Sequence, residues 1–266
     1  MLWMVVILLP VFAGAQETSA SPAPAPSPTA PAQAAQPAAP ASAVDQFDAL
    51  WPRRDSTAVA KQLQGIVNEG LKRNPNEYGL LWRSARLTQW QADGLDSDEY
   101  KKILGKQCWD VGTKAVAQNP NRVEGQYVTA ACIGAFSEGT GIVSALAQGL
   151  EGKFNGHLDK AISLDPRYSN CAPLIAKGRY FFKLPWPKRD LDKSAAEYQK
   201  AIAACPQALR AYLWLAETQL DQDHAKQAKA SVEKAKNGAV SYDPPEGRRV
   251  KAWAKKLEAK IDEELN

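Results

Sequence analysis

The chain has 266 residues, of which 45% are hydrophobic, and its 33 Lys and Arg against 29 Asp and Glu give a net charge of +4. Because this excess is small and unclustered, it argues against a nucleic-acid-binding protein, which needs grouped phosphate- and base-contacting side chains. No Cys-x-x-Cys pair occurs and neither of the two histidines has ligand spacing to a cysteine, so we expect no zinc site and no cofactor.

The first 15 residues, MLWMVVILLPVFAGA, are apolar and end in the small residues Ala-Gly-Ala. This pattern predicts a secretory signal peptide that is cut after Ala15. The stretch is too short to span a bilayer, which takes about 20 apolar residues. No Lys or Arg precedes it, and no cysteine near the cut could carry a lipid anchor. We therefore expect export to the periplasm.

Residues 16–43 consist almost entirely of Ala, Pro, Ser, Gln and Thr. Such a segment has too little apolar bulk to form a core, and its prolines favour extended polyproline II. We predict a disordered tether, either a plain spacer or a ligand for a proline-recognising partner. A folded domain is then expected over residues 44–266. It keeps all 33 basic residues and loses only Glu17 among the acidic ones, so its net charge is +5.

A small residue followed five positions later by proline recurs along this domain. The pairs are Gly70/Pro75, Ala115/Pro120, Ala161/Pro166 and Ala201/Pro206. The prolines are spaced by 45, 46 and 40 residues, and a period of this size indicates a repeat architecture. The small residue lets the next helix approach, and the proline ends one helix and begins the following one.

Between these prolines, hydrophobic residues recur at spacings of three and four residues, which predicts an all-α protein. We expect an antiparallel helical-hairpin solenoid of about four repeats, in which each hairpin covers the apolar face of its neighbour. The predicted helices lie near residues 56–73, 77–92, 97–118, 122–136, 141–164, 170–183, 190–204, 208–221, 224–237 and 244–264.

The residues at fixed positions in each hairpin resemble the tetratricopeptide repeat (TPR). The first unit has Gly112 where the family's usual aromatic residue stands, and the second and third units match in part. The fourth unit matches without a gap. The matching residues are Cys108, Ala115 and Pro120; Leu158, Ala161 and Pro166; Leu174, Gly178, Phe181, Ser194, Tyr198, Ala201 and Pro206; and Tyr212, Leu215, Ala216, Ala228, Val232 and Ala235.

The last predicted helix has no repeat partner. Val250, Trp253, Leu257 and Ile261 fall on one stripe of it, with Lys and Arg around them. This helix is interpreted as a cap that closes the stack, with a basic membrane-surface helix as the alternative.

Two insertions depart from a plain repeat. Residues 137–152, SEGTGIVSALAQGLEG, lengthen the second unit, and residues 181–190, FFKLPWPKRD, lengthen the third. Insertions in a solenoid usually lie on one face, often the binding face, although they can also serve as local core packing.

With these insertions, the chain resembles the T-component (TatT) family of TRAP transporters over roughly residues 60–237. The segments that carry the resemblance are LLWRSARL, AVAQNPN, LDKAISLDPRY and GRYFFKLPWPKRDLDKSAAEYQKAI. The resemblance implies that the repeats enclose a pore or cleft lined with apolar side chains. It also implies an association with the transporter's periplasmic solute-binding subunit. Members of that family are commonly lipoproteins, whereas this chain has no lipobox cysteine.

The four cysteines of an exported protein suggest disulfides, and four cysteines allow three pairings. Cys108 and Cys132 each lie 12 residues from Pro120, in the turn between two predicted helices. Cys171 and Cys205 are likewise equidistant from the middle of the next hairpin's loop. Since residues equidistant from a turn lie side by side on antiparallel helices, we predict the bonds Cys108–Cys132 and Cys171–Cys205.

The sequence shows no catalytic motif. His157 and His224 are more typical of solvated or capping residues than of bases, and no Gly-x-Ser-x-Gly elbow is present. The acidic run at residues 96–100 precedes a predicted helix, where Asp and Ser serve as caps as well as they bind calcium. We therefore predict a protein that is not an enzyme.

The domain contains more aromatic residues than helices with small interface residues need in order to pack against one another. Some of them are expected to line an apolar groove, although each could instead belong to the core. The groove candidates are Trp82, Trp90, Tyr127, Phe136, Tyr180, Phe181, Trp186 and Trp214.

Together these observations predict an exported binding protein. The resemblance implies an accessory component of a TRAP-type uptake system that binds an apolar ligand, the solute-binding subunit, or both. The alternative is a cell-envelope scaffold for protein–protein interaction with no small ligand. Expected partners are a periplasmic solute-binding protein or another envelope protein, and no nucleic acid.

Overall fold

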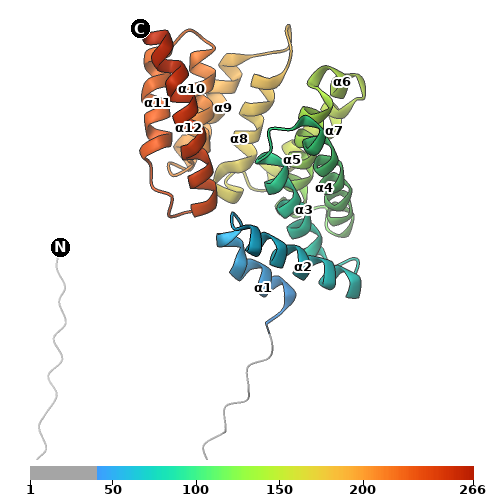
Figure 1. Ribbon diagram of the computed structural model, residues 1–266. Coiled ribbons are helices and arrows are strands. Elements are labelled where there is room, and N and C mark those ends of the chain that lie inside the picture. The colour runs from blue at the N-terminus through green and yellow to red at the C-terminus, as the bar shows by residue number, and fades with distance from the viewer. Residues whose placement is uncertain (1–40) are drawn as a thin grey trace, which may run out of the picture. The chain divides into compact units, whose positions relative to one another are not determined.

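The computed structural model describes residues 41–266, drawn in colour in Figure 1. The predicted signal peptide and nearly all of the predicted tether lie outside these residues. The described part consists of twelve α-helices and one short 3₁₀ helix, η1, with no strand among them. Their bounds are α1 Ala43–Leu50, η1 Trp51–Arg53, α2 Thr57–Arg73, α3 Tyr78–Asp93, α4 Asp98–Gln118, α5 Val123–Thr140, α6 Ile142–Ala147, α7 Leu150–Leu164, α8 Tyr168–Lys183, α9 Leu191–Ala204, α10 Leu209–Leu220, α11 Ala225–Asn237 and α12 Pro244–Leu265.

The predicted helical-hairpin solenoid is confirmed. Consecutive helices pair as α3–α4, α5–α7, α8–α9 and α10–α11, and α12 packs against α11. The four repeated prolines lie in the turns that precede α3, α5, α8 and α10. Each hairpin therefore begins just after a proline, as the ring's fixed φ and missing N–H require.

Side chains that cap the helix starts reinforce this pattern. Ser97 accepts a hydrogen bond from the backbone N–H of Tyr100 at the start of α4, so the acidic run at 96–100 supplies a cap and a first turn. Asp190 and Asp243 cap α9 and α12 in the same way. Each cap satisfies a backbone donor that the helix itself leaves unpaired.

The sequence prediction missed the first helix. Ser42 and Asp45 form a reciprocal capping box at the start of α1, in which each side chain accepts from the other's backbone N–H. This Ser-x-x-Asp pattern is the sequence feature from which the start of α1 could have been predicted. Phe47 of α1 is buried against α2 and α3, in a cluster with Leu63 and Leu80.

The single helix predicted near residues 141–164 is wrong. The segment is split into α6 and α7 at Gln148 and Gly149. Gly149 has φ +70°, a left-handed conformation that glycine adopts without steric cost and that interrupts a right-handed helix. The insertion therefore forms a short separate helix, whose Ala145 packs with Ile133 of α5 and Leu150 of α7.

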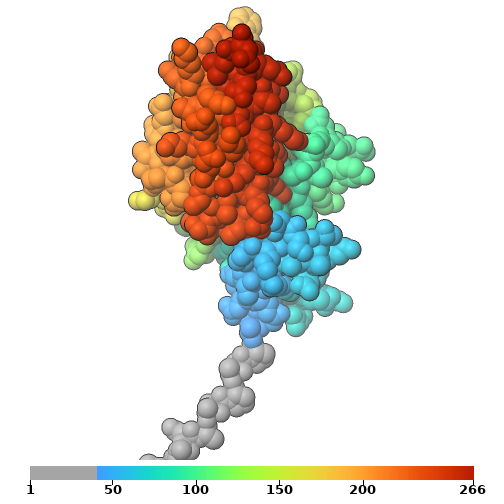
Figure 2. All heavy atoms as spheres, turned by 60° about the vertical axis from the view of Figure 1, so that its left-hand side comes forward, coloured from blue at the N-terminus to red at the C-terminus, as the bar shows by residue number. Residues whose placement is uncertain are grey.

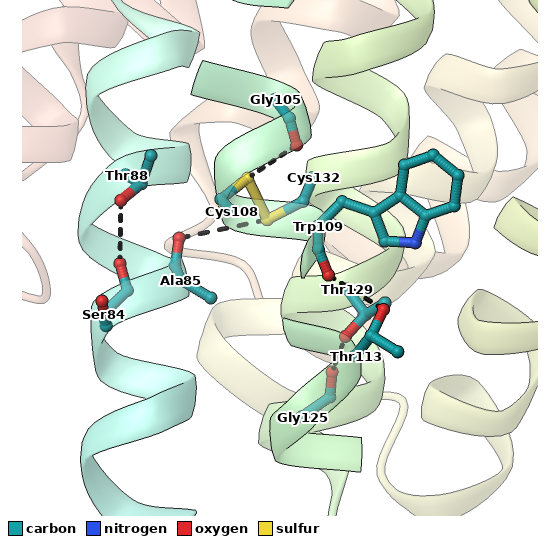
Figure 3. The surroundings of a disulfide bond; sticks show 10 residues. All are labelled: Ser84, Ala85, Thr88, Gly105, Cys108, Trp109, Thr113, Gly125, Thr129 and Cys132. Atoms are coloured by element: carbon teal, nitrogen blue, oxygen red, sulfur yellow. Dashed lines mark hydrogen bonds between the residues drawn. A yellow bond between two sulfur atoms is a disulfide. The ribbon is translucent and has the colours of Figure 1, made fainter. Parts of the chain in front are cut away.

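The close approach of α4 and α5 explains why Gly112 replaces the aromatic residue that is usual at this position of the repeat. A Cβ at this residue would lie 2.6 Å from the Thr129 hydroxyl, and one at Gly105 would lie 2.4 Å from the backbone nitrogen of Phe136. An aromatic side chain at Gly112 would force the two helices apart. The Cys108–Cys132 bond crosses the same contact, where the carbonyl oxygen of Ala85 in α3 lies 4.0 Å from the Cys132 sulfur (Figure 3).

The structure pairs the cysteines as predicted. Cys108–Cys132 joins α4 to α5, and Cys171–Cys205 joins the start of α8 to the end of α9, with Cα–Cα distances of 5.6 and 6.0 Å. Two disulfides are typical of a protein from an oxidising compartment.

The last helix closes the stack. Val250, Ala254 and Ile261 of α12 are buried against α10 and α11, while Trp253 and Leu257 are partly buried. This favours the capping interpretation. In the space-filling view, α12 (red) meets the N-terminal helical segment (blue), and α12 also contacts η1 (Figure 2). None of the described helices combines the length and the apolar character needed to cross a membrane.

Candidate functional site: a cavity inside the solenoid

A cavity of about 310 Å³ lies on the inner side of the described helices. Its walls come from η1 and from the first helix of each hairpin, with α6, α7 and α12 completing it. In a helical repeat, the small rotation from one unit to the next creates a concave surface, and here the first helix of each hairpin lines it. The cavity therefore follows directly from the repeat.

A group of partly buried charges joins α3 to α10 and α12 beside this cavity. The Asp93 carboxylate of α3 accepts hydrogen bonds from both terminal nitrogens of Arg210 in α10, at 2.9 and 2.8 Å. It also accepts one from Arg249 of α12 at 3.0 Å. Glu246 of α12 pairs with the opposite side of Arg210. We call these four residues the closure network.

The charges of the closure network depend on one another. Burial opposes ionisation of Asp93, but Arg210 and Arg249 outweigh it and hold the pKa of the Asp93 carboxyl below its usual value. Burial likewise opposes the charge on Arg210, while Asp93 and Glu246 raise the pKa of Arg210 well above its usual value. Asp93 and Arg210 are therefore both ionised at neutral pH.

A second link joins η1 to the last helix. The guanidinium of Arg54 lies between the rings of Trp51 and Trp90, 4.3 and 4.1 Å from their centroids. It donates to the Asp243 carboxylate at 2.8 Å. Only 4% of Arg54 is exposed. Cation–π contacts of this kind strengthen when they are desolvated.

One side of the cavity is apolar. Residues of α5, α6, α7 and α8 form it with small and branched side chains and one phenylalanine ring. They include Ala131, Ala135, Ile142, Ala145, Leu146, Leu150, Phe154, Ala172, Ile175 and Ala176. The insertion at residues 137–152 thus lines the cavity through α6 while it also packs in the core.

Comparison with known proteins identifies the chain. Residues 43–262 match the family model described as Regulator of microtubule dynamics protein 1-3, RMD1-3. The chain belongs to the RMD1-3 family. No curated protein matches it.

Several solved structures are similar to this chain. TTC0263, a thermophilic TPR protein of Thermus thermophilus, has 18% identity and a TM-score of 0.59, over 84% of this chain and 98% of its own. MamA has 14% identity and a TM-score of 0.43, over 77% and 94% of the two chains. YrrB, a TPR protein with an unusual peptide-binding site, has 10% identity and a TM-score of 0.42, over 80% and 90%. The first of these similarities shows the TPR-like fold.

The structure separates the eight aromatic groove candidates into two sets. Trp90, Tyr127, Tyr180 and Trp214 line the cavity. Burial raises the pKa of the Tyr127 hydroxyl above its usual value, so this hydroxyl stays neutral. The other four candidates do not line it. They are Trp82, which is buried between α3 and its neighbours, Phe136, Phe181 and Trp186.

The two histidines lie outside this cavity. His157 is half-buried, and its Nδ1 lies 2.7 Å from the Gln126 amide oxygen, to which it donates. Burial lowers the pKa of His157, so the ring is neutral at pH 7. His224 is exposed and precedes α11.

Sequence reasoning missed the charged part of the site. Around the closure network, its residues lie on α3, α10 and α12 and at the positions flanking η1 and α12, and they are Arg54, Arg86, Asp93, Arg210, Asp243, Glu246 and Arg249. No spacing along the chain links them, because Asp93 and Arg210 are 117 residues apart. The one sequence feature that could have indicated the charged part is that ionisable residues lie near aromatic residues such as Trp90 on the helices that line the cavity.

Proposed function

We propose that this protein is a non-enzymatic binding module whose cavity holds a small apolar ligand. The observation that carries the proposal is the group of apolar side chains on α5–α8, which lines one concave cavity together with the aromatic rings of Trp90, Tyr127, Tyr180 and Trp214. Sites for small molecules are typically concave, mostly apolar and equipped with a few placed polar groups. The cavity has this composition.

We further propose that the module acts in the periplasm beside a solute-uptake system. This assignment is supported by the expected signal peptide, by the two disulfides and by the resemblance of residues 60–237 to the TRAP T-component. The family description names microtubule dynamics, and none of the solved structures above is described as a transporter component. The uptake role therefore rests on the sequence resemblance and the expected export.

A scaffold for a protein partner is the second candidate. It is favoured by exposed apolar side chains at the tips of two insertions. Trp186, between α8 and α9, is 89% exposed, and Val143, in α6, is 70% exposed.

Native mass spectrometry of protein purified without detergent tests the first candidate. We expect an extra small mass that is lost on denaturation. Ala131→Phe in α5 would fill the cavity and abolish this mass, whereas Ala117→Phe on the exposed side of α4 would retain it. A bare protein in all three samples would contradict the ligand-binding proposal. A protein complex that Trp186→Ala weakens would favour the scaffold.

A further inference from the structure

The cationic side chains of the cavity are not all neutralised. Among the described residues, four of the six cations that line it pair with a carboxylate, and two form no ion pair. The pairs are Arg54–Asp243, Arg179–Glu217, Lys183–Glu138 and Arg210 with Asp93 and Glu246, and the cations without one are Arg86 and Lys101. Arg86 therefore presents an unbalanced positive charge to the interior.

Arg86 does not stand alone at its end of the cavity. Its guanidinium carbon lies 4.4 Å from the centroid of the Trp51 ring, and that of Arg54 lies 4.3 Å from the same centroid. The closest polar partner of Arg86 is the Ser169 hydroxyl, at 3.4 Å. Two guanidinium groups thus converge on one indole, with Asp243 neutralising only Arg54. A further negative charge here would relieve their mutual repulsion.

Unpaired polar atoms cluster in the same wall. Trp51 Nε1, Arg54 Nε and Asn170 Oδ1 are buried and have no hydrogen-bond partner in the structure. All three residues line the cavity. Leaving a buried polar atom without a partner destabilises a protein, so such groups usually have a partner in the functional state. The Asn170 amide can also turn its NH₂ group toward an acceptor, since the two orientations differ little in shape.

The backbone that carries Ser169 and Asn170 is unusual. Ser169, Asn170 and Cys171 have φ values of 47°, 62° and 62°, in the left-handed region that non-glycine residues rarely adopt. Cys171 is tied to Cys205. Strained conformations of this kind gather at ligand clamps, where the surrounding structure holds them.

Although Ala172 of α8 lies only two residues from Asn170, the α6 part of the apolar wall lies away from this cluster. Its α6 residues Ile142 and Leu146 belong to the helix that Figure 1 shows at the far end from α1 and α2, beyond α5 and α7. The cavity thus carries two guanidinium groups beside η1 and apolar side chains on α5, α6 and α7, where Lys101, Arg179 and Lys183 also line it.

We propose that Arg86 and its neighbours form an anion subsite that holds the carboxylate of a ligand whose apolar chain lies along α5, α6 and α7. This inference rests on the proposed function. One unpaired guanidinium matches one negative charge, which a carboxylate carries at pH 7, whereas a phosphate monoester carries about −1.5 to −2. The planar donor fork of an arginine binds a carboxylate through two parallel hydrogen bonds.

Calorimetric titration of the full chain at pH 7.5 with decanoate, decan-1-ol and decyl phosphate tests this subsite. We expect decanoate to bind roughly tenfold or more tightly than decan-1-ol, as charge-assisted hydrogen bonds predict. Arg86→Gln should remove this preference while affinity for decan-1-ol persists, and Arg86→Lys should restore part of it. Arg83→Gln is the matched control, because Arg83 lies on the same helix outside the cavity and pairs with Asp48.

Three results would overturn the inference in distinguishable ways. Equal binding of decanoate and decan-1-ol, or unchanged decanoate affinity in Arg86→Gln, would disprove the subsite and leave the proposed function standing. Tighter binding of decyl phosphate than of decanoate would show that the site selects a phosphate. Binding of none of the three probes would overturn the proposed function, and the subsite with it.

Discussion

At the scale of single residues, packing between helices depends on matched large and small side chains. Tyr198 of α9 is fully buried, and Gly178 of α8 faces its ring. A Cβ at Gly178 would lie 2.5 Å from Cε1 of Tyr198, far inside van der Waals contact. The glycine at this position of the repeat is thus required by the tyrosine opposite it.

Gly178→Ala should destabilise the protein by about 1–3 kcal/mol, because the added methyl overpacks a core that cannot yield. Urea unfolding gives the free energy of unfolding directly. Gly156→Ala is the matched control, since Gly156 is an exposed residue of α7 with nothing within 4 Å of its Cβ position. It should stabilise the helix by about 0.5–1 kcal/mol. Equal stability of both variants would show that Tyr198 moves aside.

At the scale of elements, the two disulfides hold different kinds of contact. Cys108–Cys132 lies between α4 and α5, which already pack closely through glycines. Cys171–Cys205 instead holds the left-handed first turn of α8 against the end of α9. This turn carries Asn170 and lines the cavity, so the second disulfide supports the candidate site as well as the hairpin.

Replacing Cys171 and Cys205 together by alanine should lower the free energy of unfolding by about 3–4 kcal/mol, the loop-entropy value for a separation of 34 residues. Amide hydrogen exchange should also increase at residues 168–172, because the strained turn loses its anchor. Replacing Cys108 and Cys132 together by alanine should lower the free energy of unfolding by a similar amount, but it should not increase amide hydrogen exchange locally in α4 and α5. Unchanged exchange at residues 168–172 in the first variant would contradict the anchoring role.

At the scale of the whole described unit, the closure network connects elements from both ends of the repeat. Asp93 on α3 meets Arg210 on α10 and Arg249 on α12. Removing one partner of a buried ion pair leaves a charge without compensation, and this costs more than the loss of a surface pair. The network therefore holds α3, which lines the cavity, against α10 and α12.

Asp93→Asn should reduce stability at pH 7 by about 1–3 kcal/mol, between the values expected for a surface pair and for a fully buried one, because Asp93 and its arginines are partly buried. Because the folded state holds the pKa of Asp93 below its usual value of 3.8, its contribution is present above that pH and is lost as the pH falls through the folded-state pKa. Thermal unfolding should be measured for wild type and Asp93→Asn from pH 7 to pH 2. Their stabilities should become equal only below about pH 4.

Asp110→Asn serves as the control for this pH series. Asp110 pairs with Lys106 on the surface of α4, where both side chains are more than half exposed. Its replacement should change stability by less than about 1 kcal/mol at any pH. A pH-independent difference between wild type and Asp93→Asn would refute the electrostatic explanation.

The candidate site was only partly predictable from the sequence. Four of the eight proposed aromatic residues line the cavity, namely Trp90, Tyr127, Tyr180 and Trp214. Periodicity places a residue on the apolar stripe of its helix, but it does not distinguish the side of that stripe that faces a cavity from the side that faces the next helix. This explains why Trp82 and Trp90, on the same helix, have different roles.

The sequence by itself determined the local features of this protein. Helix periodicity, the Ala-x₄-Pro spacing and the equal distances of the cysteines from their turns depend on residues close in the chain, and they predicted the hairpins and both disulfides. Only the tertiary structure decided how the repeats enclose a cavity. That outcome depends on the angle accumulated from hairpin to hairpin and on contacts such as Asp93–Arg210. No local pattern encodes these contacts, because their partners meet only after the whole solenoid has formed.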